Sequence, residues 1–250
     1  MVCAMYRRLA RAWGPQHWWP AETPFEVIAG AILTQNTTWT NVERAVANLR
    51  ASGVLSLDGI RALPLEDLQE LIRSSGYFRQ KAERLKNFAR FVDEHYHGSL
   101  GEMFAAPTFR LREQLLALKG VGPETADAIL LYAGNHSVFV IDAYARRILE
   151  RHKAVESRAK YDDVRELVER ALKNEQLPGM NAEDVSTSRP TVHPPSIMST
   201  THRPELTQVY NEMHGLLVQA GKHYCHKQEP RCDDCPLRIL LPDDGAFISQ

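Results

Sequence analysis

Apolar residues recur three and four positions apart along most of the chain, which is the spacing of amphipathic α-helices. The spacing runs through TPFEVIAGAIL, NVERAVANLR, LEDLQELIRSSG, RQKAERLKNFARFVDEH, TFRLREQLLAL, PETADAILLYAG, DAYARRILERH, YDDVRELVERAL and ELTQVYNEMHGLLVQAG. No strand alternation of comparable length is present. The first segment adds start signals, because Thr23 fits an N-cap, Pro24 the first helical position, and Glu26 the partner in a capping box. The pattern predicts an all-α fold of eight or more helices.

One segment departs from this periodicity. Residues 178–204 are rich in proline, serine and threonine and poor in large apolar side chains. Such a composition buries too little apolar surface to fix one conformation. We therefore expect a flexible loop, which we interpret as a tolerated insertion, with a regulatory role as the alternative.

Composition and charge restrict the classes of function. The 250 residues, 44% hydrophobic and 24% charged, are typical of a globular protein with one large or two small domains. No apolar run approaches the roughly 18 residues of a membrane span, and the N-terminal segment does not resemble a signal peptide. We expect a cytoplasmic monomer with no membrane partner. The net charge of -1 argues against nucleic-acid binding through bulk positive charge. The basic stretch 76–90 is either a solvated helix face or a phosphate track.

The stretch LKGVGPET predicts a turn between two helices. Gly120 and Gly122 permit backbone conformations that a side chain would oppose, and Val121 can fill the gap between the helices. Pro123 fits the first position of the next helix, where backbone N–H groups are free. Such a turn can bind a phosphate without a cationic side chain. An ordinary helical hairpin is the alternative, because many contain glycine.

A single aspartate follows the hairpin in VFVIDAYARR. The apolar segment before it delivers Asp142 to the start of another helix, where the helix dipole favours an anion. Asp142 is therefore an N-cap candidate, and that role is compatible with catalysis.

Four motifs together resemble the helix-hairpin-helix DNA glycosylases of the endonuclease III superfamily: LKGVGPETA, VIDAYARR, AILTQNTT and GLLVQAGKHYCHKQEPRCDDCPL. The resemblance covers residues 17 to 237 without the loop. It implies a six-helix middle domain over 21–135 with the hairpin at 115–130, a second domain formed by 1–20 and 136–250, and an active site in the cleft between them. It also implies double-stranded DNA with a damaged base as the partner, in the nucleoid if the cell is bacterial. The implied site residues are Asp142 as catalytic carboxylate, Gln35 in the gap left by the flipped base, and Lys119, Gly120, Val121 and Gly122 on the DNA backbone.

One departure from the family pattern is informative. Members that also cut the strand carry a lysine 18 residues before the aspartate, and this chain has Glu124 there. A carboxylate cannot form the Schiff base with deoxyribose, so the usual lyase activity is not expected. Lys119 lies on the hairpin side of the glycines and is not assigned that role. HWWPAETPFEVIAGAILTQNT, SGYFRQKAERL and KGVGPETADAILLYA are similar to the monofunctional 3-methyladenine DNA glycosylase III branch.

That branch implies an aromatic pocket for the flipped base. Trp18, Trp19 and Pro20 would lie near the base, and Trp39 would supply a further aromatic face. A cationic methylated purine gains roughly 0.5 to 2 kcal/mol from a favourable indole contact. Its glycosidic bond is already weakened, so Asp142 would need only to stabilise the oxocarbenium-like sugar and orient or deprotonate water. The alternative for Trp18 and Trp19 is anchoring of the N-terminal segment in the core.

Cys225, Cys232 and Cys235 have the spacing C-x6-C-x2-C, which matches the first three ligands of the family's 4Fe-4S cluster in the loop 225–235. The fourth ligand is expected at position 241, which is Leu241, and the remaining Cys3 is remote in sequence. Three thiolates could hold such a cluster with an unusual fourth ligand, or zinc with His223 or His226. They could also remain from a lost cluster, whereas a disulfide is disfavoured in a cytoplasmic chain.

The leading hypothesis is a monofunctional DNA glycosylase for alkylated purines such as 3-methyladenine. A second is an endonuclease III-like glycosylase with AP lyase activity for oxidised or mismatched pyrimidines. A third is a noncatalytic DNA-binding protein that keeps the hairpin.

Overall fold

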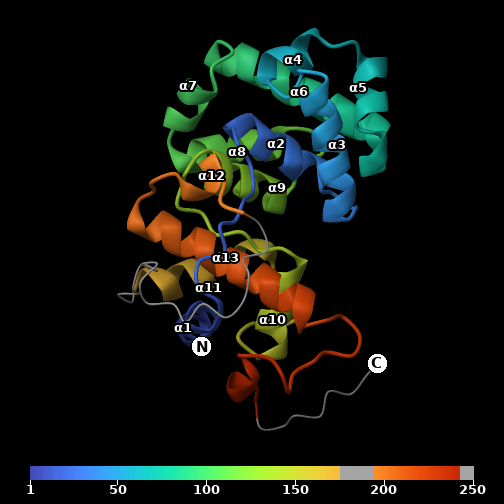
Figure 1. Ribbon diagram of the computed structural model, residues 1–250. Helices are drawn as coiled ribbons and strands as arrows, with labels where there is room; N and C mark the ends of the chain where they lie inside the picture. The colour runs from blue at the N-terminus through green and yellow to red at the C-terminus, as the bar shows by residue number, and fades with distance from the viewer. Residues whose placement is uncertain (175–193, 243–250) are drawn as a thin grey trace. The chain divides into compact units, whose positions relative to one another are not determined.

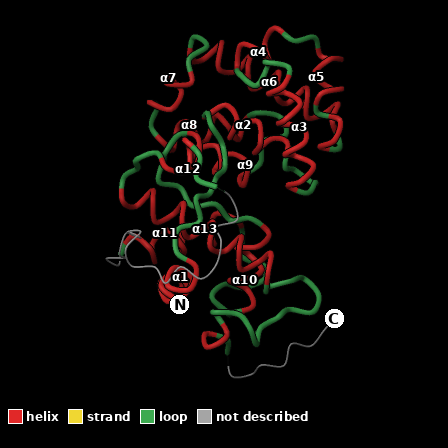
Figure 2. The backbone as a smooth tube through the Cα atoms, viewed as in Figure 1, coloured by secondary structure: helices red, strands yellow, loops and turns green. Residues whose placement is uncertain are grey.

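The computed structural model describes residues 1–174 and 194–242, and within these ranges the chain forms helices and turns without strands (Figure 2). The prediction of an all-α fold is confirmed. None of the helices in the described ranges is long and apolar enough to cross a membrane. The chain divides into two compact units, one formed by Ala21–His136 and the other by Met1–Pro20 and Ser137–Gln250.

The unit Ala21–His136 is built around one nearly all-buried helix, α2 (Pro24–Leu33). Nine of its ten residues are buried, which makes α2 the core of the unit rather than an amphipathic surface helix. The elements that complete the unit are α3 (Trp39–Ala51), α4 (Leu57–Ala62), α5 (Leu65–Leu71), η1 (Arg73–Ser75), α6 (Phe78–Tyr96), α7 (Leu100–Ala105), α8 (Thr108–Ala117), α9 (Pro123–Ala128) and the π-helical segment η2 (Ile129–Ala133). Helix α2 packs against α3, α6, α9 and η2.

The start of α2 confirms one half of the predicted capping box. The Thr23 hydroxyl accepts a hydrogen bond from the backbone N–H of Glu26 at 3.2 Å. The Glu26 carboxylate accepts from the backbone N–H of Glu22 at 3.2 Å, not from that of Thr23. Its other oxygen pairs with the Arg50 guanidinium. Glu26 therefore ties the start of α2 to α3 instead of closing a local box.

The second unit contains α1 (Val2–Trp13), α10 (Ala143–Arg151), α11 (Tyr161–Lys173), α12 (Ile197–Thr200), α13 (Glu205–His223) and the short turn η4 (Arg238–Leu240). In Figure 1, α13 is the long orange helix beside α10, α11 and α1, and it packs against all three. Its buried face carries polar as well as apolar residues. This helix therefore forms the centre of the unit.

The predicted flexible loop 178–204 needs a partial correction. Residues 178–193 lie outside the described residues. The remainder contains α12, whose N-cap Ser196 and Ser199 exchange hydrogen bonds in a capping box. The Arg203 side chain is buried and donates to the carbonyls of Met198, Ser199 and Thr201. Serine and threonine in this part of the segment thus act as caps, and an arginine closes the short helix.

Candidate functional site

The turn between α8 and α9 has a left-handed glycine, a buried valine and a proline that begins the next helix. Gly120 has φ +86°, a left-handed conformation that favours glycine. A Cβ on Gly120 would lie 2.2 Å from Nε of Arg84, so the backbone and this side chain are in close contact. Val121 is buried, as predicted, and its N–H donates to the Leu118 carbonyl at 3.0 Å. Pro123 occupies the first position of α9.

Gly122 differs from Gly120 both in its backbone conformation and in the space around it. Its φ of −95° is open to any residue, so the expectation of a conformation reserved for glycine is wrong at this position. A Cβ there would meet no atom within 4 Å. Neither backbone conformation nor packing requires glycine at the N-cap of α9. What the missing side chain leaves is open space beside the first N–H groups of the helix, where an anion can approach the backbone.

Gln35, which follows α2, lies on this hairpin. Its Nε2 donates to the Gly120 carbonyl at 3.0 Å and to the Thr125 hydroxyl at 2.8 Å. Its Oε1 accepts from the Arg84 guanidinium of α6. Three elements of one unit therefore meet at the candidate gap-filling residue. Arg84 belongs to the basic stretch 76–90, but its contact with Gln35 was not predicted.

The same stretch contains a lysine that is not part of a solvated face. Lys81 is 1% exposed, and its Nζ donates to the carbonyls of Leu33 at 2.9 Å and Ser75 at 2.6 Å. Burial, helped by the nearby charge of Arg84, lowers the pKa of Lys81 from 10.5 to about 8. Lys81 satisfies the last carbonyl of α2, immediately before the segment that carries Gln35. The solvated-face prediction is therefore wrong for Lys81.

Asp142 is the N-cap of α10. Its Oδ1 accepts a hydrogen bond from the backbone N–H of Ala145 at 2.7 Å, which orients the carboxylate. The preceding residues 138–141 are buried, whereas the Asp142 side chain retains 15% exposure. The predicted N-cap role is present, and the second carboxylate oxygen is not used by the cap. The carboxylate is thus fixed in place and accessible.

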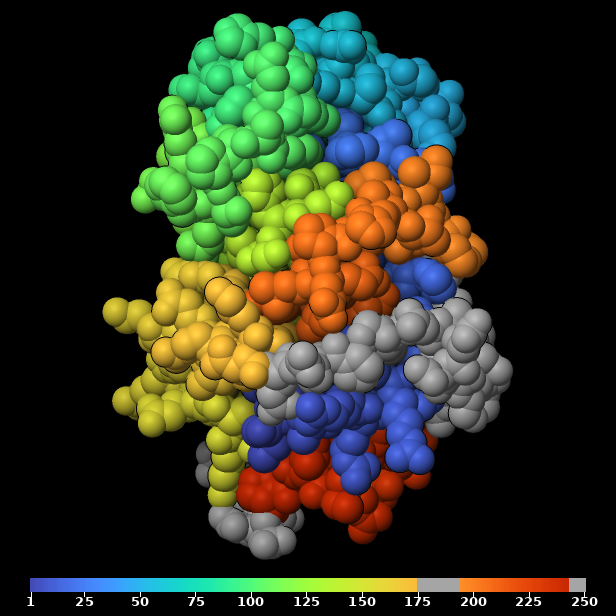
Figure 3. All heavy atoms as spheres, turned by 90° about the vertical axis from the view of Figure 1, so that its left-hand side faces the viewer, coloured from blue at the N-terminus to red at the C-terminus, as the bar shows by residue number. Residues whose placement is uncertain are grey.

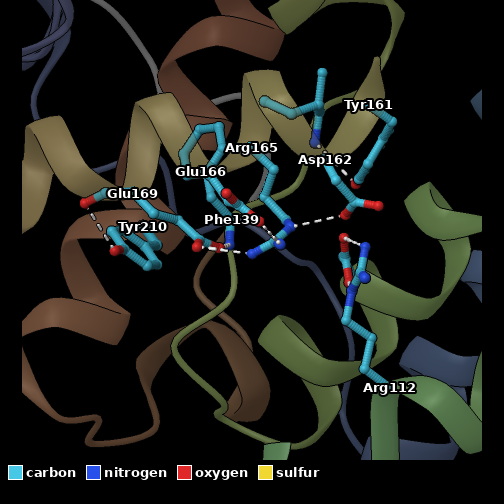
Figure 4. A network of polar contacts seen from close by, with 10 residues as sticks. Arg112, Phe139, Tyr161, Asp162, Arg165, Glu166, Glu169 and Tyr210 are labelled. Carbon is cyan, nitrogen blue, oxygen red and sulfur yellow. Dashed lines mark hydrogen bonds and ion pairs between the residues drawn. The ribbon is translucent and has the colours of Figure 1, made fainter. Parts of the chain in front are cut away.

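Helix α11 holds the extended segment that leads to Asp142 (Figure 4). The backbone N–H of Phe139 donates to the Glu169 carboxylate at 2.8 Å, and that of Ile141 donates to the Tyr161 hydroxyl at 3.2 Å. Figure 4 shows Arg165 beside Glu169, and its Nη1 lies 2.7 Å from a Glu169 oxygen. Alternate backbone groups of the segment are therefore satisfied by side chains of one helix.

A histidine that the sequence did not single out approaches the same carboxylate. Nε2 of His214, on α13, lies 3.7 Å from Oδ2 of Asp142. His214 is buried, and this burial lowers the pKa of the imidazole, although the Asp142 charge opposes part of the shift. A signal was present in the sequence, because a histidine on the otherwise buried face of a long helix requires a polar partner.

The tryptophans proposed for a base pocket differ in exposure. Trp18 and Trp19 are 8% and 6% exposed, and their rings lie 5.4 Å apart. The Lys222 ammonium of α13 lies 5.4 Å from the centre of the Trp18 ring, so this indole already attracts a cation. Trp39 begins α3 and is half-buried. Pro20, which belongs to the other unit, is also half-buried. Trp18 and Trp19 thus have the burial of core anchors.

Two ionisable residues that the sequence singled out at the hairpin, Glu124 and Lys119, both face solvent. Glu124 lies in the first turn of α9 and is exposed, where its charge complements the helix dipole. Lys119 is exposed on the other side of Gly120. The structure therefore places a carboxylate, not an amine, at the position where lyases of the resembled family carry lysine.

Cys225, Cys232 and Cys235 line one small cavity, and Leu241 lines it with them. The four positions that the spacing singled out, three thiols and one leucine, therefore line the same cavity. His152 also lines the cavity, and its Nδ1 lies 2.8 Å from the Ile148 carbonyl. His223 and His226 do not line the cavity.

Cys3 does not complete this set. Its thiol donates to the Ala171 carbonyl of α11 at 3.1 Å. The N-terminal helix does pack beside the C-terminal segment, because Arg8 shares a surface hollow with residues 233–241, and Figure 3 shows blue α1 next to the red segment. None of the four cysteines, all of which the structure describes, forms a disulfide. In the part of the chain that the structure describes, no three metal-ligating side chains have metal-binding geometry, so the residues do not fit a four-cysteine cluster.

The matching family model decides the assignment. Residues 29–174, more than half of the chain, match the HhH-GPD superfamily of base excision DNA repair proteins. The chain belongs to this superfamily. A protein of Methanocaldococcus jannaschii assigned to the DNA repair glycosylases is 39% identical over 95% of this chain and 94% of its own length. The endonuclease III of Thermotoga maritima is 29% identical over 86% of this chain and 81% of its own.

A solved structure extends the comparison to three dimensions. The 3-methyladenine DNA glycosylase of H. pylori, bound to 1,N6-ethenoadenine, superposes with a TM-score of 0.68. It is 28% identical, and the match covers 88% of this chain and 95% of that one. The predicted resemblance to the helix-hairpin-helix DNA glycosylases is confirmed, and the protein is a DNA glycosylase of the endonuclease III type.

Proposed function

We propose that this DNA glycosylase is monofunctional and releases alkylated purines such as 3-methyladenine from double-stranded DNA. The observation that carries the proposal is the geometry of the Asp142 carboxylate. One oxygen is fixed by the Ala145 N–H at 2.7 Å, the preceding segment is held by α11, and the side chain remains partly exposed. A carboxylate oriented in this way can stabilise positive charge that develops on the sugar.

The proposed reaction follows extrusion of the damaged nucleotide from the stack. The glycosidic bond breaks and its electron pair leaves with the base, which neutralises a cationic N3-methylated adenine. Asp142 stabilises the oxocarbenium-like sugar and orients water. The water oxygen bonds to the anomeric carbon, and its proton passes to the carboxylate and then to solvent. The products are a free base and an abasic strand.

Two features of the hairpin support release without strand cleavage. Glu124 occupies the position of the lyase lysine, and a carboxylate forms no imine. Lys119 is exposed on the opposite side of Gly120 from α9. The similarity to the 3-methyladenine glycosylase of H. pylori supports the same branch.

The remaining site roles are part of the proposal. Gln35 would enter the gap left by the flipped nucleotide, and backbone N–H groups from Gly120 to Gly122 would hold a phosphate. Trp39, which is half-buried, would stack on the base. Trp18 and Trp19 would form a rigid wall of the pocket rather than a mobile face.

Base release from a panel of duplexes tests this function. Methylated, oxidised, deaminated and crosslinked DNA are incubated with the wild type and with Asp142→Asn. We expect wild-type release of 3-methyladenine and its loss in the variant. No 3-methyladenine release would refute the substrate assignment, and equal release by both proteins would refute the role of Asp142.

The 29% identity to an endonuclease III favours one alternative, a glycosylase and AP lyase for oxidised or mismatched pyrimidines. Borohydride trapping distinguishes it, because a lyase amine forms a reducible imine with abasic DNA. A trapped covalent complex would contradict the monofunctional proposal.

A further inference from the structure

Helix α13 presents buried polar side chains to the segment that carries Asp142. Thr207, Asn211 and His214 are spaced four and three residues apart, so they share one face of the helix. They are 0%, 1% and 4% exposed. Apolar residues would normally occupy such a face, because burying a polar group without a partner is unfavourable. Three buried polar groups on one face of α13 therefore require partners among the residues that this face meets.

Contacts show what this face meets. The Thr207 hydroxyl lies 2.7 Å from that of Ser137, at the start of the segment. Nε2 of His214 lies 3.7 Å from Oδ2 of Asp142, at its end. The amide nitrogen of Asn211 is buried between these positions on the helix and has no hydrogen-bond partner among the described residues. The polar face of α13 therefore runs along the segment and ends at the catalytic carboxylate.

The immediate surroundings restrict how His214 and Asp142 can interact. Oδ1 of Asp142 is fixed by the Ala145 N–H, so the remaining freedom lies at Oδ2. The Phe139 ring packs edge-on against the imidazole, with 6.2 Å between ring centres. An ionised carboxylate only accepts hydrogen bonds, so the imidazole nitrogen that faces it must donate. A separation of 3.7 Å is longer than a hydrogen bond, but catalytic contacts commonly shorten when substrate binds.

The charge of the imidazole also matters. Burial favours the neutral ring, and the pKa of His214 is lowered accordingly. A neutral donor orients the carboxylate and leaves its negative charge in place for the sugar. A protonated imidazole would instead neutralise that charge.

We propose that His214 is a positioning residue, whose Nε2–H donates to Oδ2 of Asp142 and holds the carboxylate toward the developing sugar cation. This inference rests on the proposed function, because it assigns His214 a role only if Asp142 acts on the sugar. Because His214 is only 4% exposed, its role is to act through Asp142. A merely structural role for the polar face would leave the interaction of Asp142 with a cation unchanged.

An abasic-site analogue provides a test that does not depend on the identity of the base. Duplexes carry either a cationic pyrrolidine or a neutral tetrahydrofuran in place of the sugar, and their affinities are measured by fluorescence anisotropy. The ratio of the two affinities reports how well the protein holds a positive charge at the sugar. The proteins are the wild type, Asp142→Asn, His214→Leu and His214→Gln. Leucine removes the donor at similar volume, whereas the glutamine Nε2 can replace it.

We expect the wild type to prefer the pyrrolidine duplex and Asp142→Asn to lose this preference. His214→Leu should reduce the preference about tenfold, equivalent to one charge-assisted hydrogen bond. His214→Gln should retain most of it, and the affinity of the two His214 variants for the neutral analogue should stay unchanged, which also shows that these variants fold.

The outcomes separate the two claims. A wild-type preference that Asp142→Asn loses but His214→Leu keeps overturns the role of His214 alone. No preference in the wild type, or one that survives in Asp142→Asn, contradicts the proposed function itself. A nitrogen-15 NMR measurement on the wild type adds a check without any substitution. The inference requires the neutral tautomer protonated at Nε2 of His214, and the Nδ1 tautomer would overturn it.

Discussion

Alanine substitutions at Gly120 and Gly122 should separate the folding role of the hairpin from its phosphate-binding role. The two glycines are two residues apart but differ in their surroundings. Gly120 has φ +86° and abuts Arg84, whereas Gly122 has an ordinary φ and open space where its Cβ would lie. Gly120→Ala should therefore destabilise the fold, and Gly122→Ala should weaken DNA binding in a stable protein.

The magnitudes follow from these contacts. A left-handed alanine is disfavoured by about 1–2 kcal/mol. The new Cβ would also displace the Arg84 guanidinium, and the lost hydrogen bond to Gln35 adds about 1–2 kcal/mol. For a chain of this size the total corresponds to a fall in Tm of about 5–10 °C. Gly122→Ala should leave Tm within about 2 °C of the wild type and lower affinity for abasic-site duplex about tenfold, because the methyl group obstructs backbone N–H groups.

Differential scanning calorimetry and fluorescence anisotropy at one fixed salt concentration provide the two measurements, since phosphate contacts depend strongly on salt. If Gly122→Ala bound DNA as tightly as the wild type, the open space at the start of α9 would have no role in binding. If Gly120→Ala melted at the wild-type temperature, the close contact with Arg84 would not constrain the turn.

Three further predictions concern other parts of the molecule. Gln35→Ala and Arg84→Ala should be non-additive in abasic-DNA affinity, with a coupling of about 0.5–1 kcal/mol in a double-mutant cycle, and additive losses would contradict the contact. Lys81 has a folded pKa of about 8 against an ordinary 10.5, so between these pH values the unfolded chain binds more protons and stability rises with pH. Lys81→Met should therefore lack this rise in urea unfolding series, and equal slopes would refute the burial argument. Leu241→Cys should raise iron content and visible absorbance after anaerobic reconstitution, because it adds a fourth thiol to the cavity, and unchanged iron would exclude position 241 as a ligand site.

Short-range patterns predicted much of this molecule because the relevant physics is local. Helix periodicity predicted the all-α fold, and Thr23, Pro24 and Asp142 are where start signals place them. The glycine of the hairpin that has a left-handed conformation, Gly120, lies within the predicted turn. Cap and turn chemistry depends on a few adjacent residues, so one sequence suffices to identify it.

Contacts between distant segments were not accessible in the same way. His214 and Asp142 are 72 positions apart, and Arg84 and Gln35 are 49 apart. The sequence pattern predicts Lys81 to be a solvent-exposed charge on a basic helix. In the structure its ammonium group is buried and donates to two carbonyls from other elements. Periodicity shows that a polar residue faces the core but not which group receives it. The helix α12 and its N-cap Ser196 could not be predicted either, because a serine-rich segment has the composition of a loop.

The fate of the DNA strand tests the central claim most directly. A 3-methyladenine duplex, labelled at one end, is incubated with the wild type, and each sample is divided between alkali treatment and no treatment before a denaturing gel. Alkali breaks a strand at an abasic site, so the account predicts cleavage in the treated half and an intact strand in the untreated half. Cleavage without alkali would show lyase activity despite Glu124, and an intact strand in both halves would show that the protein does not release the base.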